Sequence, residues 1–181
     1  MPGGVVCRAR LPADARRADL LRCRSRVAAS KHMARADVIV VGGGIVGLAT
    51  AFQIQQLSPG RAVHVHEKEP EVGRHQTGHN SGVLHTGVYY RPGSAKALNC
   101  RDGRAAMVRF CEEQGVAHEI CGKVIVATSP DELPRLEALH ERAQANGVRC
   151  EAIPPERLAE LEPAARGIRT LHVRDAGIVD Y

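Results

Sequence analysis

Three glycines in the first third of the chain have the spacing of a phosphate-binding turn. Gly42, Gly44 and Gly47 form the pattern G-x-G-x-x-G and directly follow a short aliphatic run, residues 38–41. Between a strand and a helix, such a turn presents backbone N–H groups and the positive end of the helix dipole to a pyrophosphate. Glu67 lies twenty residues after Gly47, where an acid can accept hydrogen bonds from a ribose. The pattern predicts a dinucleotide site rather than a chance glycine-rich turn.

A second stretch with chemical potential is "HQTGHNSGVLHTGVYY", residues 75–90, which holds three of the nine histidines and two of the three tyrosines. It lies within an irregular segment, residues 68–93, and loops of that length in a compact domain are usually functional. Its small residues let a main chain lie against a flat ligand. This favours a flavin over a nicotinamide, and Glu67 argues against NADP, which needs a basic ribose site.

Regular elements must position these residues. Residues 38–41 predict a parallel strand buried on both faces, and the helix and strand after them complete one βαβ unit. Ser94 and Gly115 predict the two caps of a long helix, and residues 129–132 predict a capping box. The expected helices are 45–57, 94–114, 129–147 and a short one after residue 155, and the expected strands are 38–41, 61–67, 120–128 and 170–174.

Charge and cysteine usage exclude several classes of protein. The net charge is +5, but residues 1–35 carry nine basic and two acidic side chains, +7, and residues 36–181 carry 16 basic and 18 acidic ones, −2. The body therefore lacks the basic stripe of a nucleic-acid-binding protein. The six cysteines have neither C-x-x-C nor metal-finger spacing, so we predict no metal site and reduced thiols.

The Arg-rich leader, residues 1–35, permits two interpretations. It has the composition of a mitochondrial transit peptide, or Met33 is the true start and the residues before it are not translated. Both interpretations exclude the leader from the fold, and we expect it to be disordered if it is translated. We accordingly expect a cytoplasmic protein, with peripheral membrane association left open, or a mitochondrial one if the leader is a transit peptide.

At this point the sequence resembles a known family. The segments "DVIVVGGGIVGLATA", "HEKE", "HQTGHNSGVLHTGVYYRPGSAKALNC", "CGKVIVATS" and "GIVDY" are similar to the L-2-hydroxyglutarate oxidase/dehydrogenase family, FAD enzymes of the D-amino-acid-oxidase-like group. The resemblance extends from about residue 36 to residue 181. It implies oxidation of L-2-hydroxyglutarate to 2-oxoglutarate, with hydride transfer from C2 of the substrate to the flavin N5. Electrons would then pass to oxygen or a membrane quinone.

The resemblance also implies roles for individual residues. Gly42, Gly44 and Gly47 would bind the FAD pyrophosphate and Glu67 the adenosine ribose, with Lys68 beside it. The residues that match the loop along the pyrophosphate and isoalloxazine are Thr77, Gly78, Asn80, Ser81, Gly82 and Val83.

The resemblance further implies the domain organisation. The fold class is α/β, a Rossmann-like FAD-binding βαβ unit followed by the beginning of an α+β substrate domain. Residues 36–115 would be the N-terminal part of the FAD domain and residues 116–181 the start of the substrate domain. The chain would then be a fragment of a larger two-domain flavoenzyme, inactive on its own.

The substrate side offers weaker candidates. His85 could accept the hydroxyl proton or orient a substrate carboxylate, or it could simply bond the backbone. Tyr89, Tyr90 and Arg91 could bind a dicarboxylate, Arg91 through its bidentate fork, or the tyrosines could pack at a domain boundary. Two other functions remain open: a related flavoenzyme acting on an amino acid or glycerol phosphate, and a non-enzymatic cofactor-binding fragment.

Overall fold

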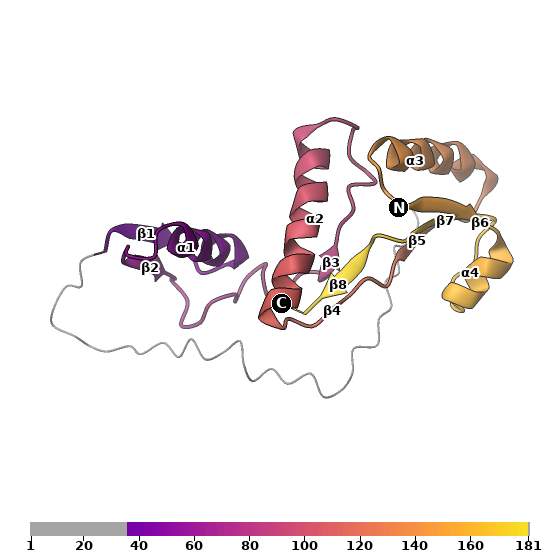
Figure 1. Cartoon of the computed structure of the whole chain (residues 1–181). Helices are drawn as coiled ribbons and strands as arrows, with labels where there is room; N and C mark the ends of the chain where they lie inside the picture. The colour runs from indigo at the N-terminus through magenta and orange to yellow at the C-terminus, as the bar shows by residue number, and fades with distance from the viewer. Residues whose placement is uncertain (1–35, 181) are drawn as a thin grey trace. The chain divides into compact units, whose positions relative to one another are not determined.

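The structure, a computed structural model, describes residues 36–180, which form two compact units (Figure 1). The N-terminal unit comprises residues 36–81 and the C-terminal unit residues 82–180. The leader and both interpretations of it lie outside the described residues. Among residues 36–180, no helix is both long and apolar enough to cross a membrane.

The N-terminal unit is a βαβ unit. It consists of β1 (Val38–Val41), α1 (Ile45–Leu57) and β2 (Val63–His66), and the two strands pair in parallel with Val38 opposite Val63. The N–H of Gly42 continues the ladder by donating to the His66 carbonyl at 2.8 Å. The predicted strand, glycine turn, helix and second strand are therefore confirmed.

The faces of β1 differ from the prediction. The sequence analysis expected burial on both faces, but Ile39 is 58% exposed and Val41 is 87% exposed, while Val38 and Val40 are half-buried. A parallel strand is buried on both sides only when elements cover both faces of its sheet. Here α1 contacts β1 and β2, and the side chains that face away from it are exposed.

The C-terminal unit contains two antiparallel sheets of three strands each. Both sheets place a late strand of the chain in the middle, between two earlier ones. The first has the order β3 (Val83–Leu84), β8 (Gly177–Val179), β4 (His118–Glu119), and the second β5 (Lys123–Ala127), β7 (Arg169–Val173), β6 (Cys150–Ile153).

Helix α2 (Ala95–Gln114) begins and ends at the predicted caps. The Ser94 hydroxyl accepts a hydrogen bond from the Ala97 N–H at 3.3 Å, and Gly115 adopts a left-handed conformation with φ of 67°. Such a conformation favours glycine because it has no Cβ. Both caps are confirmed.

The predicted capping box is wrong in its detail. A short 3₁₀ turn, η2 (Pro130–Glu132), precedes α3 (Leu133–Ala145), and the Ser129 side chain makes no capping hydrogen bond. The Glu132 carboxylate accepts mainly from the N–H and hydroxyl of Thr128, at 2.7 and 3.0 Å, and more weakly from the Ser129 N–H, so only the glutamate half of the capping box is present. The tighter 3₁₀ turn changes the position of Glu132 relative to the preceding backbone.

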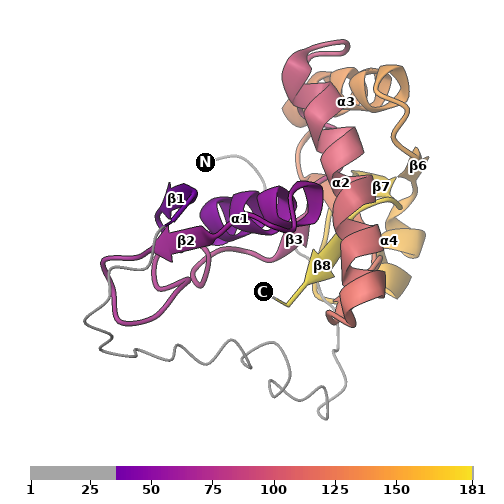
Figure 2. The same ribbon diagram turned by 60° about the vertical axis from the view of Figure 1, so that its left-hand side comes forward.

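Each sheet of the C-terminal unit carries a helix over one face (Figures 1 and 2). Cys111 of α2 packs on Leu84 and Val179 of the first sheet. Leu136 of α3 packs on Ala127 and Leu171 of the second sheet. The predicted short helix is α4 (Pro155–Leu161), whose Leu158 is fully buried.

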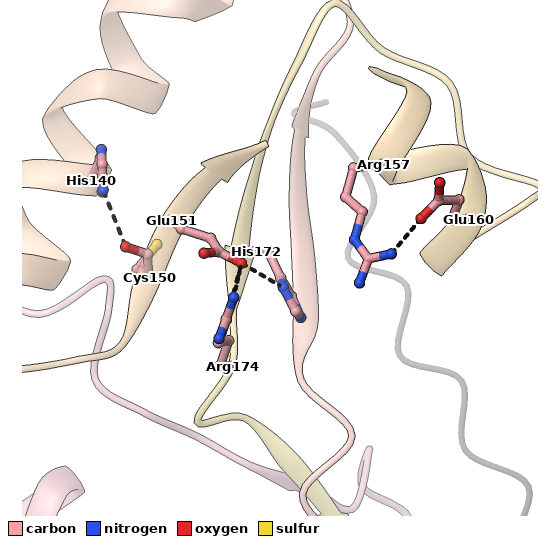
Figure 3. Close-up of polar contacts among 7 residues, drawn as sticks. All are labelled: His140, Cys150, Glu151, Arg157, Glu160, His172 and Arg174. Atoms are coloured by element: carbon pink, nitrogen blue, oxygen red, sulfur yellow. Dashed lines mark hydrogen bonds and ion pairs between the residues drawn. The ribbon is translucent and has the colours of Figure 1, made fainter. Parts of the chain in front are cut away.

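Polar contacts tie β6 to β7 (Figure 3). The Glu151 carboxylate accepts from the Arg174 guanidinium at 2.6 Å and lies 3.5 Å from Nδ1 of His172, its cross-strand neighbour. The hydrogen bonds from Arg174 hold the pKa of Glu151 below its usual value. His140 of α3 reaches the Cys150 carbonyl at 3.2 Å. These contacts fix the register of the sheet and its position under α3.

Along the chain, the boundary between the two compact units follows Ser81. The sequence analysis instead placed a domain boundary after Gly115. In the C-terminal unit, α2 packs on β3 and β8, so residues on both sides of Gly115 share one core. The boundary at 115 concerns the domains of the complete flavoenzyme and stays a prediction.

Candidate functional site

The glycine turn at the end of β1 depends on two backbone constraints. Gly42 has φ of 103°, a conformation that side chains rarely adopt. A Cβ on Gly47 would overlap the carbonyl oxygen of Gly42 and lie 3.5 Å from a methyl group of Val40. The first turn of α1 therefore rests directly on the end of β1, as the fingerprint predicts.

The Glu67 carboxylate, at the end of β2, holds this turn in place. One oxygen accepts from the Gly43 N–H at 2.6 Å and the other from the Glu69 N–H at 3.0 Å. Both hydrogen bonds lower the pKa of Glu67, and the one from the Glu69 N–H has the larger effect. An ionised carboxylate has lone pairs left for further donors. The two observed hydrogen bonds are therefore compatible with a contact between Glu67 and the ribose, which stays a prediction.

Thr77 caps helix α1 from a distant part of the chain. Its hydroxyl accepts a hydrogen bond from the Ile45 N–H at 2.9 Å, across 32 residues of sequence. The local N-cap residue, Gly44, has no side chain to do this. The Thr77 hydroxyl therefore lies at the positive end of α1, where anionic groups are stabilised.

A cavity of about 400 Å³ opens beside these groups. Its walls combine the glycine turn, the end of β2 and the following loop, and they carry Lys68, Arg74 and His75. Backbone N–H groups, glycines and cationic side chains suit a pyrophosphate, so the residues present fit the phosphate part of FAD. The lining is Val41, Gly42, Gly44, His66, Glu67, Lys68, Glu69, Gly73, Arg74, His75, Gln76 and Thr77.

The sequence analysis missed Arg74 as part of this lining, because nothing in its spacing marks it. Arg74 forms an ion pair with Glu71 at 2.8 Å, and the His75 ring lies 3.0 Å from the Glu69 carboxylate. Nδ1 of His79 lies 2.9 Å from the His75 carbonyl oxygen, so the His79 ring bonds the backbone of its own loop.

The remaining predicted loop residues do not line the cavity. Asn80 shapes the loop by donating from its side-chain amide to the carbonyls of Gln76 and Thr77, at 3.1 and 2.7 Å. Gly78 and Ser81 follow the same turn in the N-terminal unit, whereas Gly82 and Val83 belong to the C-terminal unit. Contact of Gly78, Asn80, Ser81, Gly82 and Val83 with FAD stays a prediction.

The substrate-side candidates lie between β3 and α2, in the C-terminal unit. His85, Tyr89, Tyr90 and Arg91 are all exposed. The Tyr89 ring covers the ammonium group of Lys123, which lies 4.5 Å from the ring centroid. Their exposure leaves all four side chains accessible to a small molecule.

The surroundings of His85 lower its pKa. Burial of part of the ring is the larger cause, and the positive charge of Lys123 is the second. Both causes disfavour the protonated imidazolium. The sequence analysis missed Lys123 because a lysine within an aliphatic strand carries no functional motif, although it is only 5% exposed here.

The comparisons with known proteins agree with this geometry. Residues 37–181 match the family model described as FAD dependent oxidoreductase. The chain is 50% identical over 146 residues to L-2-hydroxyglutarate dehydrogenase of Indibacter alkaliphilus, covering 80% of this chain and 37% of the relative. It is 44% identical over 146 residues to the human mitochondrial L-2-hydroxyglutarate dehydrogenase, covering 80% and 32%. The chain thus spans about a third of the length of these relatives.

Solved structures share the fold. L-alpha-glycerophosphate oxidase from Mycoplasma pneumoniae with FAD bound matches with a TM-score of 0.74 and 27% identity, over 82% of this chain and 40% of that one. Glycine oxidase from Geobacillus kaustophilus matches with a TM-score of 0.71 and 23% identity, over 80% and 40%. These matches confirm the predicted fold class and, with the family model, the predicted cofactor FAD.

Replacing Gly47 by alanine tests the close contact between α1 and β1. Because the new Cβ overlaps the Gly42 carbonyl, we expect G47A to displace the turn, at a cost of about 1–3 kcal/mol, and to lose bound flavin. Flavin absorbance per mole of purified complete gene product measures the effect. Gly60 is exposed with nothing within 4 Å, so G60A is the matched control. Equal flavin content in both variants would contradict this role for Gly47.

Replacing Thr77 by valine tests the distant helix cap. T77V keeps the shape but removes the acceptor for the Ile45 N–H, which typically costs about 1 kcal/mol. We expect FAD to bind roughly fivefold more weakly to T77V, since that energy corresponds to such a factor, while T77S binds as the wild type does. FAD titration of the apoprotein measures both. A T77S variant as weak as T77V would show that the methyl group matters instead.

Proposed function

Because this chain belongs to the family of FAD-dependent oxidoreductases, we propose that it is part of an enzyme that oxidises L-2-hydroxyglutarate to 2-oxoglutarate. The observation that carries the proposal is the 50% identity to an L-2-hydroxyglutarate dehydrogenase across nearly the whole described region. The cavity beside the glycine turn supports it, since its residues fit the cofactor on which the reaction depends.

The residues of the N-terminal unit would hold the cofactor. The N–H groups at the start of α1, together with Lys68 and Arg74, supply hydrogen bonds and positive charge for the pyrophosphate. Glu67 keeps the glycine turn closed and offers its remaining lone pairs to the ribose. When bound, FAD supplies a hydride acceptor for the substrate carbon that carries the hydroxyl.

The residues of the C-terminal unit would act on the substrate. His85, whose pKa is lowered, accepts the hydroxyl proton at one of its ring nitrogens, so that a carbonyl can form as the hydride leaves. Arg91 and the hydroxyl groups of Tyr89 and Tyr90 bind the carboxylates. Their exposure supports this role.

Electron acceptor and location are further parts of the proposal. We propose oxygen or a quinone as the acceptor, with peripheral association of the complete protein at a membrane in the second case. The location is cytoplasmic, or mitochondrial if residues 1–35 are a transit peptide. The relatives of this chain include bacterial and mitochondrial enzymes.

A second candidate substrate is glycerol phosphate. The match to a glycerophosphate oxidase, at a TM-score of 0.74, favours it over other relatives of the fold. The higher identity to the L-2-hydroxyglutarate dehydrogenases, 50% against 27%, makes it the weaker candidate.

Turnover assays on the complete, FAD-loaded gene product decide between these substrates. We expect the rate of flavin reduction by L-2-hydroxyglutarate to exceed that by glycerol 3-phosphate or amino acids by about a hundredfold or more. A substrate that leaves polar groups of the binding site without a hydrogen-bond partner is strongly disfavoured. Anaerobic bleaching of the flavin absorbance measures each rate. Faster bleaching by glycerol 3-phosphate would overturn the proposal in favour of the second candidate.

The pH dependence tests His85 as the base. Activity should rise with pH through the His85 pKa. Because that pKa is lowered, the activity should reach its plateau at a lower pH than with an ordinary histidine. Replacing Lys123 by methionine removes a positive charge, which raises the His85 pKa and moves this limb to higher pH. H85N should abolish the limb and lower kcat by about 10²–10⁴-fold. A limb that persists in H85N would assign the proton acceptor to another group.

A further inference from the structure

The segment that carries the substrate-side candidates contains a tight turn. The N–H of Tyr90 donates to the Gly87 carbonyl at 3.0 Å, and Gly87 has φ of 84°. Both tyrosines lie on this turn, His85 precedes it and Arg91 follows it. The position of the turn therefore decides where four exposed side chains point.

Two side chains from the end of α3 hold the turn by its carbonyl groups. The Asn146 side-chain amide donates to the carbonyls of Gly87 and Tyr90, at 3.1 and 2.9 Å. The Arg142 guanidinium donates to the Tyr89 carbonyl at 3.2 Å. These contacts join parts of the chain more than fifty residues apart, so local sequence does not explain them.

The Asn146 donor lies at the well-packed C-terminal end of α3. Asn146 is the C-cap residue of α3, and its own N–H donates to the carbonyls of Arg142 and Ala143, at 3.0 and 3.2 Å. Ala143 is fully buried in the core of the C-terminal unit. The Asn146 amide is therefore presented by backbone that packing and hydrogen bonds both immobilise.

Other elements hold the same segment from different sides. The Cys100 thiol of α2 donates to the His85 carbonyl at 3.3 Å. The Lys123 ammonium of β5 lies under the Tyr89 ring. Asn146 differs from both in binding two carbonyls of one turn, so it restrains orientation as well as position.

We propose that Asn146 is a positioning residue for substrate binding. It fixes the 87–90 turn, and with it Tyr89, Tyr90 and Arg91, in the orientation that receives a substrate carboxylate. This inference rests on the proposed function for the identity of the substrate, but the restraint of the turn is a property of this unit alone. Misplacement of a substrate-positioning group by about 1 Å can cost about a hundredfold in rate.

The test uses the complete, FAD-loaded gene product with N146A and N146D. The aspartate keeps the shape of asparagine, but when ionised it has no donor for the two carbonyls. We expect both variants to raise KM for L-2-hydroxyglutarate about tenfold or more, with flavin content unchanged. Gln144 is exposed on the same helix end and contacts His140, so Q144A and Q144E are the matched controls for truncation and charge.

A second readout does not depend on activity. Hydrogen–deuterium exchange should accelerate at the Tyr90 amide in N146A and N146D, while strands β5 and β7 exchange as in the wild type. Unchanged exchange at Tyr90 overturns the inference whatever the substrate is. Faster exchange with unchanged KM also overturns it, because Asn146 is then only structural. A wild type that does not oxidise L-2-hydroxyglutarate defeats the proposed function, and KM is then measured with the substrate that bleaches the flavin.

Discussion

The contact between the start of α1 and the end of β1 is the constraint on which the nucleotide site depends. Because Gly47 has no side chain, the helix approaches until it touches the Gly42 carbonyl. At that separation the glycine turn and the end of β2 line one cavity. The positive φ of Gly42 turns the chain sharply enough to permit it. Two backbone requirements thus create a site for a large anionic cofactor.

Polar side chains from later in the chain then complete what the glycines leave open. A glycine turn has no side chains of its own to satisfy the first N–H groups of the helix. The Glu67 carboxylate accepts a hydrogen bond from the Gly43 N–H, and the Thr77 hydroxyl accepts one from the Ile45 N–H. The irregular loop therefore has a structural function besides any contact with FAD, since it stabilises the turn that we expect to receive the phosphates. The same arrangement recurs in the C-terminal unit, where Asn146 satisfies carbonyls of another glycine-containing turn.

Sequence patterns predicted the elements whose signals are local. The βαβ unit, both caps of α2 and the helix α3 all follow from local sequence patterns. The strands β3, β4, β6 and β8 were missed because they are only two to four residues long and are defined by partners distant in sequence. In the site, the glycines and Glu67 have a motif, whereas Arg74, Lys123 and Asn146 acquire their roles only through tertiary contacts. The exposure of Ile39 was mispredicted for the same reason, since burial depends on what packs against a strand.

The N-terminal unit shows why cofactor binding and folding should be coupled in this chain. The glycine turn of this unit is held by the parallel strand pairing and by the hydrogen bonds that Glu67 and Thr77 accept from the Gly43 and Ile45 N–H groups. A ligand that binds only the ordered turn adds its binding free energy to the stability of the unit. Glu67 and Thr77, which we expect to lie beside bound FAD, are consequently also the residues that keep the turn folded.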